Sequence, residues 1–310
     1  MSTSETSHQG DARVEVETIA VLGAGTMGHG IAQVAAAVGF RVVMRDVDRD
    51  SLARGVRAIE NNLDKGIKRG KVTEDERDMT LQRLRGAVSL EETRDADLFI
   101  EAVPERMELK CETLRAVEEI ATRPFIFATN TSSLSITDIA RDARRPERVV
   151  GLHFFNPVHI MRLVEIVVGK RTSAETVEAV RGVGVRMRKE PITVRDVPGF
   201  ASSRLGVALG LEAMRMLEAG VASAKDIDTA MELGYNHPMG PLRLTDVVGL
   251  DVRLQIAEYL HRALESESFR PPEILRRMVA EGKLGKKTGE GFYEWNDEKQ
   301  KSEVRSQKSE

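Results

Sequence analysis

The sequence has few of the features that mark secreted, membrane-spanning or nucleic-acid-binding proteins. It holds one cysteine in 310 residues, so an internal disulfide is impossible, a reducing compartment is expected, and metal sites built on cysteine are excluded. No run approaches the roughly 18 apolar residues of a membrane span. The formal net charge of −3 shows no excess of basic residues of the kind that would attract a nucleic acid. We therefore expect a soluble globular protein that binds neither membranes nor nucleic acids.

The first residues do not resemble a targeting segment, and both ends of the chain are polar. The first fifteen residues have no apolar stretch and include acidic side chains, unlike a secretory signal or an arginine-rich transit peptide. Residues 1–16 and 296–310 are polar and poor in aromatic side chains, so we expect two flexible tails. These observations predict a cytoplasmic protein.

Between these tails the chain is long enough for two domains. Over residues 17–196, short β-branched runs alternate with helical segments. Strands are expected at residues 19–22, 41–45, 96–103, 125–128 and 149–155, with a last one near 192–196. This alternation is typical of a Rossmann-type, doubly wound and mostly parallel sheet with helices on both faces.

Val197-Pro198-Gly199 is typical of a linker. After it, the spacing of apolar residues becomes that of helices. Helices are expected at residues 200–219, from a capping box at 223–226, at 245–264 and at 272–280. We therefore expect residues 197–295 to form an all-helical domain, a candidate for substrate binding and dimerisation. Apolar residues within 205–211 and 247–256 are a candidate homodimer interface. The alternative is that they pack only within the chain.

A glycine-rich loop joins the first expected strand to the first expected helix. Gly23, Gly25 and Gly28 have G-x-G-x-x-G spacing, and Thr26 and Met27 complete the loop. The first glycine permits a tight turn, the second lets the backbone approach a pyrophosphate, and the third allows close helix–strand contact. The helix N-terminus supplies amide donors to the phosphates. The loop predicts a dinucleotide site.

Asp46 ends the second strand 23 residues after Gly23, near the expected spacing of about 20. A carboxylate there accepts hydrogen bonds from the adenine ribose hydroxyls, which favours NAD over NADP. Arg45 and Arg49 are nearby cations that would tolerate a 2′-phosphate, so use of NADP stays open.

Polar residues follow two other expected strands at the same edge of the sheet. Ser132 comes after residues 125–128 with its hydroxyl able to face the cleft, whereas Ser135 is better explained as the cap of the next helix. Glu105 and Lys110 follow the fourth strand. They form either cofactor contacts or a structural ion pair.

Residues 151–168 predict a hairpin that carries a proton-transfer pair. If the hairpin is centred on His159, His153 lies opposite Glu165, with Cβ atoms about 5 Å apart. A carboxylate bound to one imidazole nitrogen fixes the tautomer and leaves the other nitrogen to act as a base. The alternative is an ordinary edge hairpin in which both residues are structural.

Seven motifs in a fixed order resemble those of the L-3-hydroxyacyl-CoA dehydrogenase family. They are G-A-G-T-M-G, N-T-S-S, G-L-H-F-F-N-P, L-V-E-I-V, D-V-P-G-F, H-P-M-G-P and G-K-K-T-G-E-G-F-Y. The likeness spans residues 18–295, and in length the chain is similar to the single-function 3-hydroxybutyryl-CoA dehydrogenases. The resemblance implies hydride transfer between NAD and C3 of an L-3-hydroxyacyl-CoA.

The resemblance also implies roles for individual residues. His153 is the general base for the C3 hydroxyl, Glu165 holds its imidazole, and Ser132 hydrogen-bonds the substrate oxygen at C3. The implied cofactor contacts are the glycine loop, Asp46, Glu105, Lys110, Ser132, Asn156 and Lys287.

Contacts to coenzyme A are implied at Asn62 and Arg69. The expected helix at residues 51–70 ends in a basic cluster of Lys65, Lys68, Arg69 and Lys71, whose cations suit phosphates. The alternative is a solvated basic face that complements the helix dipole.

The chain departs from the family at Ser203. Family members usually have Asn-Arg after P-G-F, with the asparagine facing the reacting centre, whereas this chain has Ser203-Arg204. Serine is shorter and offers one donor, which puts substrate orientation there in question. Two other functions stay open: a β-hydroxyacid dehydrogenase that uses a lysine on a free acid, and a catalytically silent NAD-binding protein.

Overall fold

The computed structural model describes residues 15–295. The predicted tails lie outside the described residues, except for Glu15 and Val16, and Val16 packs against the core. The chain divides between Val197 and Pro198 into two compact units.

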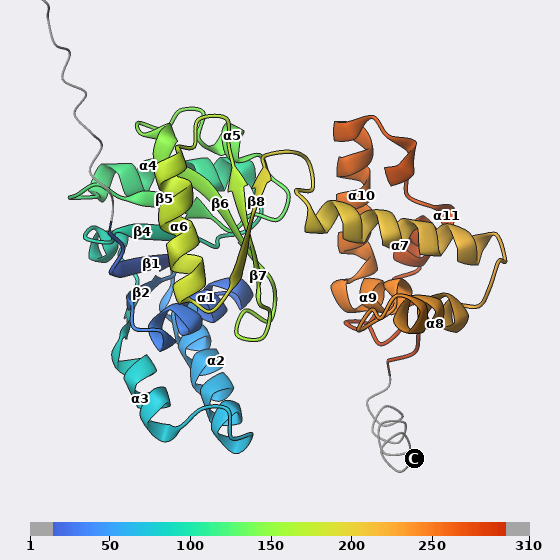
Figure 1. The fold of residues 1–310 in the computed structure, drawn as a ribbon, viewed down its shortest axis with the longest axis horizontal. Coiled ribbons are helices and arrows are strands. Elements are labelled where there is room, and N and C mark those ends of the chain that lie inside the picture. Colours follow the sequence, from blue (N-terminus) through green and yellow to red (C-terminus); the bar gives the residue numbers. More distant parts are fainter. Residues whose placement is uncertain (1–14, 296–310) are drawn as a thin grey trace, which may run out of the picture. The chain divides into compact units, whose positions relative to one another are not determined.

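The first unit is built on an eight-stranded sheet (Figure 1). Its order is β3-β2-β1-β4-β5-β6-β7-β8, in which β1 to β6 are parallel, β7 is antiparallel to β6, and β8 is parallel to β7. The strands are β1 (Thr18–Leu22), β2 (Arg41–Arg45), β3 (Leu84–Ala87), β4 (Leu98–Glu101), β5 (Ile126–Thr129), β6 (Val149–Phe154), β7 (Leu163–Val168) and β8 (Glu190–Arg195). The predicted Rossmann-type, mostly parallel sheet is confirmed.

Helices connect these strands. They are α1 (Thr26–Ala37), α2 (Arg49–Lys68), α3 (Glu74–Gln82), α4 (Met107–Ile120), α5 (Ile136–Ile139) and α6 (Ala174–Arg186), with short 3₁₀ turns at Leu90–Thr93 and Pro146–Arg148. Because side chains alternate across a strand, Ile19 and Val21 of β1 point to the same face. There they share one core with Ile59 of α2 and Val180 of α6. Helices α1, α2 and α6 thus cover one face of the sheet.

The chain reverses its direction of progress across the sheet between β1 and β4. From β1 it moves outward through β2 to β3, and it then returns to place β4 on the other side of β1. In open α/β sheets such a switch point, at the carboxyl ends of the strands, is where ligands bind. The cofactor site is therefore expected where β1 and β4 end.

Strand β3 and helix α3 are not predicted by the sequence patterns above. The sequence of β3 is Leu-Arg-Gly-Ala, and only Ala87 is buried. As an edge strand it pairs with β2 alone, so it lacks the apolar run by which a central strand is recognised.

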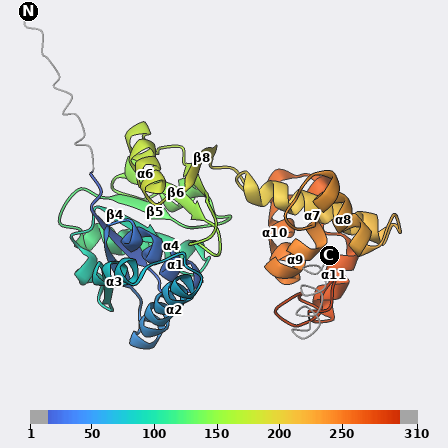
Figure 2. The same ribbon diagram turned by 60° about the horizontal axis from the view of Figure 1, so that its bottom comes forward.

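The second unit is helical. It comprises α7 (Ser202–Glu218), α8 (Ala224–Gly234), α9 (Pro241–Val248), α10 (Leu250–Leu264) and α11 (Glu273–Ala280), with a 3₁₀ turn at Glu267–Phe269. Helices α7, α9 and α10 pack against one another (Figure 2). Their shared core includes Leu211, Leu242 and Leu250. At the start of α8, the Ser223 side chain accepts a hydrogen bond from the Asp226 amide, as the capping pattern predicts.

The prediction of one helix over residues 245–264 is wrong. Gly249 separates α9 from α10, and its φ of +105° is strained for any residue with a side chain. Apolar periodicity continues across the break because both helices bury a face in the same core, which hid the boundary.

The buried carboxylate of Asp246 on α9 binds the last described segment, residues 292–295, through hydrogen bonds. Asp246 is 1% exposed and accepts hydrogen bonds from the amides of Phe292 and Tyr293, each at 2.9 Å, and from the Trp295 indole at 2.8 Å. Burial raises the pKa of Asp246. Gly291 permits this close approach, since a methyl group there would lie 2.3 Å from a carboxylate oxygen of Asp246.

We predict that Asp246→Ala destabilises the helical unit by at least about 3 kcal/mol, because it leaves buried donors without an acceptor. Urea unfolding followed by fluorescence reports on this region directly, since Trp295 is the sole tryptophan. Glu281→Ala, which removes an exposed carboxylate from the same unit, is the control. Equal unfolding midpoints for the two variants would contradict the prediction.

Candidate active site

The three loop glycines have distinct steric environments. Gly23 has a φ of +109°, and a methyl group there would lie 2.7 Å from the Ala102 carbonyl oxygen. A methyl group on Gly28 would lie 1.7 Å from the Gly23 carbonyl oxygen. Gly25 has no heavy atom within 4 Å of the corresponding position. Two glycines therefore close the turn, and the third leaves an open face at the N-terminus of α1, as a pyrophosphate requires.

Asp46 lies beside this loop. Its Oδ2 accepts a hydrogen bond of 2.7 Å from the Ala24 amide, which fixes the carboxylate next to the turn. An open hollow of about 270 Å³ lies here, lined by Ala24, Gly25, Thr26, His29, Asp46, Ser51, Arg54, Gly55 and Ala58. An acceptor carboxylate beside a helix N-terminus fits the adenine ribose and pyrophosphate of a dinucleotide.

Of the arginines near this hollow, the sequence pattern singled out two that do not line it. Arg45 instead donates a hydrogen bond to the Val88 carbonyl, and Arg49 is absent from the lining. Arg54 is the arginine that lines the hollow, one helical turn after Ser51, with which it hydrogen-bonds. Its place on the first two turns of α2, directly after Asp46, is the signal that would have found it.

Glu105 organises the loop that carries Ser132. One of its carboxylate oxygens accepts hydrogen bonds from the Thr131 hydroxyl at 2.6 Å, the Ser132 amide at 3.0 Å and the Ser133 amide at 3.2 Å. The Ser132 hydroxyl lies 3.3 Å from the same oxygen. Asn130 links this loop to the end of β6 by accepting a hydrogen bond from the Phe154 amide. The loop is thus held between the ends of β4 and β6.

Beneath this loop, Lys110 lies in a buried ion-pair network. Its Nζ is 2.8 Å from Glu101 and 3.3 Å from Glu105, and Lys110 and Glu101 are almost fully buried. Burial favours the neutral form of Glu105, but Lys110 and the donors of the 131–133 loop outweigh it and hold the pKa of Glu105 below its ordinary value. Of the two alternatives for Glu105 and Lys110, the structure shows the ion pair. Their contacts to the cofactor stay a prediction.

His153 and Glu165 face each other across the antiparallel strands β6 and β7. The register pairs the two residues directly, so the predicted hairpin register is confirmed. His153 Nδ1 lies 2.8 Å from Glu165 Oε2, with Glu165 fully buried and His153 7% exposed. A carboxylate accepts only, so Nδ1 carries the proton and the lone pair of the neutral imidazole is on Nε2. This arrangement suits a general base.

The hairpin loop that carries Asn156 packs on α1. Val158 is buried against Gly30 of that helix, where a methyl group would lie 2.9 Å from a Val158 side-chain carbon. The buried Lys189 ammonium donates to the carbonyls of Val158 and Met161 and so fixes the loop. Asn156, two residues before Val158, is thereby held near the helix that begins at the glycine loop.

The structure brings one group of predicted residues together and leaves others apart. The glycine loop, Asp46, Glu105 and the Ser132 loop follow the carboxyl ends of parallel strands β1, β2, β4 and β5, and His153 is the next-to-last residue of β6. By contrast, Arg69 follows the 20-residue helix α2, about 30 Å from its start beside Asp46.

Two further predicted residues have local partners, and a third is placed only by its helix. Asn62 of α2 donates to Gln33 of α1. In the helical unit, Lys287 pairs with Asp251 at 2.6 Å, and Ser203 lies in the first turn of α7.

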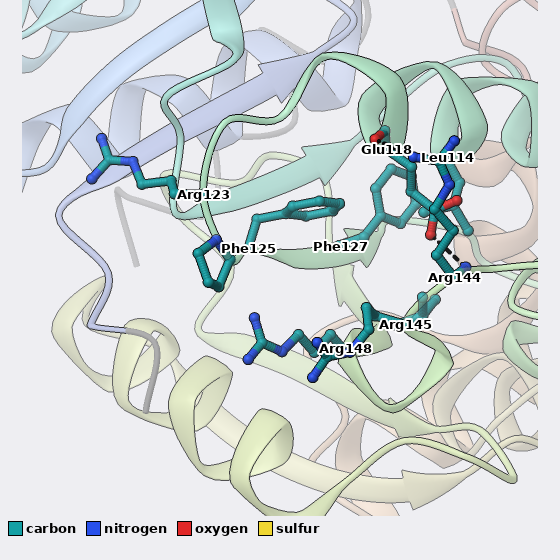
Figure 3. A pocket seen from close by; sticks show the side chains of 10 residues that line it. Leu114, Glu118, Arg123, Phe125, Phe127, Arg144, Arg145 and Arg148 are labelled. Atoms are coloured by element: carbon teal, nitrogen blue, oxygen red, sulfur yellow. Dashed lines mark hydrogen bonds between the residues drawn. The ribbon is translucent and has the colours of Figure 1, made fainter. Parts of the chain in front are cut away.

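A separate hollow of about 270 Å³ opens at the opposite edge of the sheet, where β5 and β6 begin (Figure 3). Phe125 and Phe127 form its apolar floor, and arginines surround it. These include Arg144, which is bound to Glu118, as the dashed lines in Figure 3 indicate. Because it lies at the amino ends of the strands, this hollow is no part of the cofactor edge.

Residues 15–295 include no helix long and apolar enough to cross a membrane. Within the same range, no group of three or more His, Cys, Asp or Glu side chains is placed to hold a metal ion.

Comparison with known proteins gives matches over nearly the whole chain. Residues 18–197 match the NAD-binding domain of 3-hydroxyacyl-CoA dehydrogenase, and residues 199–295 match its C-terminal domain. The chain is 43% identical over 284 residues to a probable 3-hydroxybutyryl-CoA dehydrogenase of Bacillus subtilis, covering 92% of this chain and 99% of that protein. It is 40% identical to the mitochondrial hydroxyacyl-coenzyme A dehydrogenase of Homo sapiens, covering 95% and 96%.

A solved structure agrees with these matches. The crystal structure of (S)-3-hydroxybutyryl-CoA dehydrogenase from Ralstonia eutropha superposes with a TM-score of 0.88 at 41% identity, covering 91% of this chain and all of that one.

The environments of Gly25 and Gly28 predict opposite effects of adding one methyl group. Gly28→Ala should lower the melting temperature, because the methyl group collides with the Gly23 carbonyl. Gly25→Ala should melt like the parent but bind NADH about tenfold or more weakly, since its methyl group occupies the face left for the pyrophosphate. Thermal melting and NADH fluorescence titration separate the two. An unchanged NADH affinity in Gly25→Ala would show that the cofactor does not approach this face.

Proposed function

The chain belongs to the 3-hydroxyacyl-CoA dehydrogenase family, and we propose that it interconverts 3-hydroxybutyryl-CoA and acetoacetyl-CoA with His153 and Glu165 as its acid/base pair. It is an NAD-dependent enzyme of that family. The observation that carries the proposal is the 2.8 Å bond between His153 and the fully buried Glu165, at the sheet edge that also carries the glycine loop. The Bacillus and Ralstonia relatives support a four-carbon substrate.

In oxidation, His153 Nε2 takes the proton of the C3 hydroxyl. Bound NAD supplies the acceptor for the hydride that leaves C3. His153 returns the proton to the C3 oxygen when the reaction runs as a reduction. Throughout, Glu165 accepts from Nδ1–H, so it fixes the reactive tautomer and stabilises the imidazolium that forms. Its burial keeps water from competing for that bond.

Ser132 and Asn156 would position the two reactants. The Ser132 hydroxyl would bind the substrate oxygen at C3, with Glu105 holding its loop through hydrogen bonds to Thr131, Ser132 and Ser133. Asn156, on the loop packed against α1, would help place the nicotinamide. Glu105, Lys110 and Lys287 would complete the cofactor contacts, which requires Lys287 to turn from Asp251.

Coenzyme A would be held by the C-terminal end of α2. Lys65 and Lys68 lie in its last turn and Arg69 caps it, so cations gather where phosphates would be attracted. Asn62 lies two turns earlier, between α2 and α1.

The helical unit would mediate a homodimer. Large apolar side chains remain exposed on α7, α9 and α10, most clearly Leu205 at 71% exposure. The others on these helices are Leu244, Val247, Val248 and Val252. Exposed apolar side chains of this kind favour association with another apolar surface, such as the same surface on a second copy of the chain.

We place the enzyme in the cytoplasm. Its single cysteine cannot form an internal disulfide, which is in keeping with a reducing compartment.

Initial rates with 3-oxoacyl-CoA substrates of four to sixteen carbons, each with NADH and NADPH, test the proposal. We expect the highest kcat/KM with acetoacetyl-CoA and NADH. In the oxidative direction, activity with free 3-hydroxybutyrate but not with its CoA thioester would contradict the substrate class. Binding of NADH without turnover of any substrate would indicate a catalytically silent NAD-binding protein.

We predict that His153→Gln lowers kcat by about 10²–10⁴-fold or more, because it removes the acid/base group. The NADH dissociation constant should stay near that of the parent. His159→Gln, on the same hairpin, is the matched control and should keep most of the activity. A large loss of NADH affinity in His153→Gln would mean that His153 has a structural role.

At the position where the family usually has asparagine, Ser203→Ala should lower kcat/KM for acetoacetyl-CoA several-fold, because it removes the one side-chain donor there. The affinity for NADH, measured on the same preparation, should not change. If neither kcat nor KM moves, Ser203 has no part in substrate orientation.

A further inference from the structure

The hollow at the amino ends of β5 and β6 (Figure 3) lies apart from the cofactor edge and has an apolar floor. Ile126 and Ala128 of β5 point into the core that α1, α2 and α6 cover. Because side chains alternate along a strand, Phe125 and Phe127 point to the opposite face of the sheet. There they line the hollow together with Leu114 of α4. The floor therefore offers two phenyl rings and a leucine to an apolar group.

The charged residues that line the hollow are mostly cations. They are Arg123, Arg144, Arg145 and Arg148, with Glu118 as the one carboxylate among the lining residues. An oxygen of that carboxylate accepts a hydrogen bond of 2.8 Å from the main-chain amide of Arg144. The lining thus combines four positive charges with one negative charge, which favours an anion as the ligand.

Three of these arginines lie at the rim, where their side chains are about half exposed. Their acidic partners are Asp97, Glu119 and Glu147, none of which lines the hollow. A guanidinium carries five N–H donors in a planar fork, so an arginine that pairs with one carboxylate can still bind a second anion. The ion pairs therefore position the cations without placing further negative charge in the hollow.

Arg148 differs from the other three arginines because it is buried. It is 7% exposed and lies at the end of the 3₁₀ turn Pro146–Arg148, directly before β6. The attraction between a guanidinium and an anion is stronger in low-polarity surroundings than in water. Arg148 is therefore the arginine expected to contribute most to the binding of an anion.

We propose that this hollow binds a small carboxylate with an apolar body, aliphatic or aromatic, at a site separate from the active site. The apolar body lies on Phe125 and Phe127, and the carboxylate binds Arg148 and the arginines at the rim. Ligand sites in proteins are mostly apolar with a few placed polar groups, as this one is. Arginine binds a carboxylate through two parallel hydrogen bonds, which fixes the orientation of the ligand.

The size and place of the hollow limit what it can bind. Its volume of about 270 Å³ is just below the roughly 300–1,000 Å³ that is common for drug-sized ligands. A dinucleotide or a whole CoA thioester is too large to be enclosed there. Because the hollow is at the edge of the sheet opposite the glycine loop, the carboxylate and NADH should bind independently of each other.

Isothermal titration calorimetry with matched probes tests the proposal. Octanoate and phenylacetate have both a charge and an apolar body, their amides lack the charge, and acetate lacks the apolar body. We expect at least one of the two larger carboxylates to bind about tenfold or more tightly than its amide and than acetate, because charge-assisted hydrogen bonds are the stronger ones. The tighter of the two shows whether a chain or a ring suits the floor.

Variants of the lining separate the two parts of the site. Arg148→Gln should weaken binding of the carboxylate about tenfold and leave that of the amide nearly unchanged. Phe125→Ala should weaken both. Arg145→Gln, at the exposed rim, should also weaken the carboxylate alone, and it keeps the test decisive if Arg148→Gln does not fold. Arg141→Gln removes an exposed arginine outside the lining and is the matched control.

Saturation with NADH or with acetoacetyl-CoA distinguishes this hollow from the active site. We expect the affinity for the carboxylate to be the same with and without either compound. Competition by one of them would place the carboxylate in the active site and overturn the inference. Equal affinities for a carboxylate and its amide, or folded arginine variants that bind the carboxylate as the parent does, would overturn it as well.

Discussion

The antiparallel pairing of β6 and β7 is the constraint on which the active site depends. Strand geometry brings directly opposed side chains within hydrogen-bonding reach, and this register opposes His153 and Glu165. The buried carboxylate then fixes the imidazole through Nδ1. A shift of one residue would turn one partner to the other face of the sheet and separate the pair. β8 on one side of this hairpin and β5 on the other hold the register in place.

The rest of the Rossmann unit supplies what such a pair needs. The switch point at β1 and β4 creates an edge where a glycine loop and Asp46 suit a dinucleotide. Glu105, supported by the buried Lys110, ties the Ser132 loop to that edge. One sheet thus positions the proposed acid/base group, the hydroxyl proposed to bind the substrate oxygen, and the edge suited to the cofactor. The match of residues 18–197 to an NAD-binding domain agrees with a dinucleotide site at this edge.

The sequence predicted those features that depend on local spacing. The hairpin register follows from the symmetric positions of His153 and Glu165 about the turn, and the fold class follows from alternating strands and helices. Features set by distant neighbours were not predicted. The acceptor role of Glu105 depends on a loop 26 to 28 residues away, and the helix break at Gly249 depends on its backbone angle.

In the proposed mechanism, Glu165 acts in catalysis only through His153. A double-mutant cycle in kcat, with Glu165→Gln, His153→Gln and the double variant, measures this coupling most directly. We predict that Glu165→Gln slows the parent by orders of magnitude and that the double variant is no slower than His153→Gln alone. Independent, multiplicative losses, or a Glu165→Gln variant with the parent's kcat, would contradict the account.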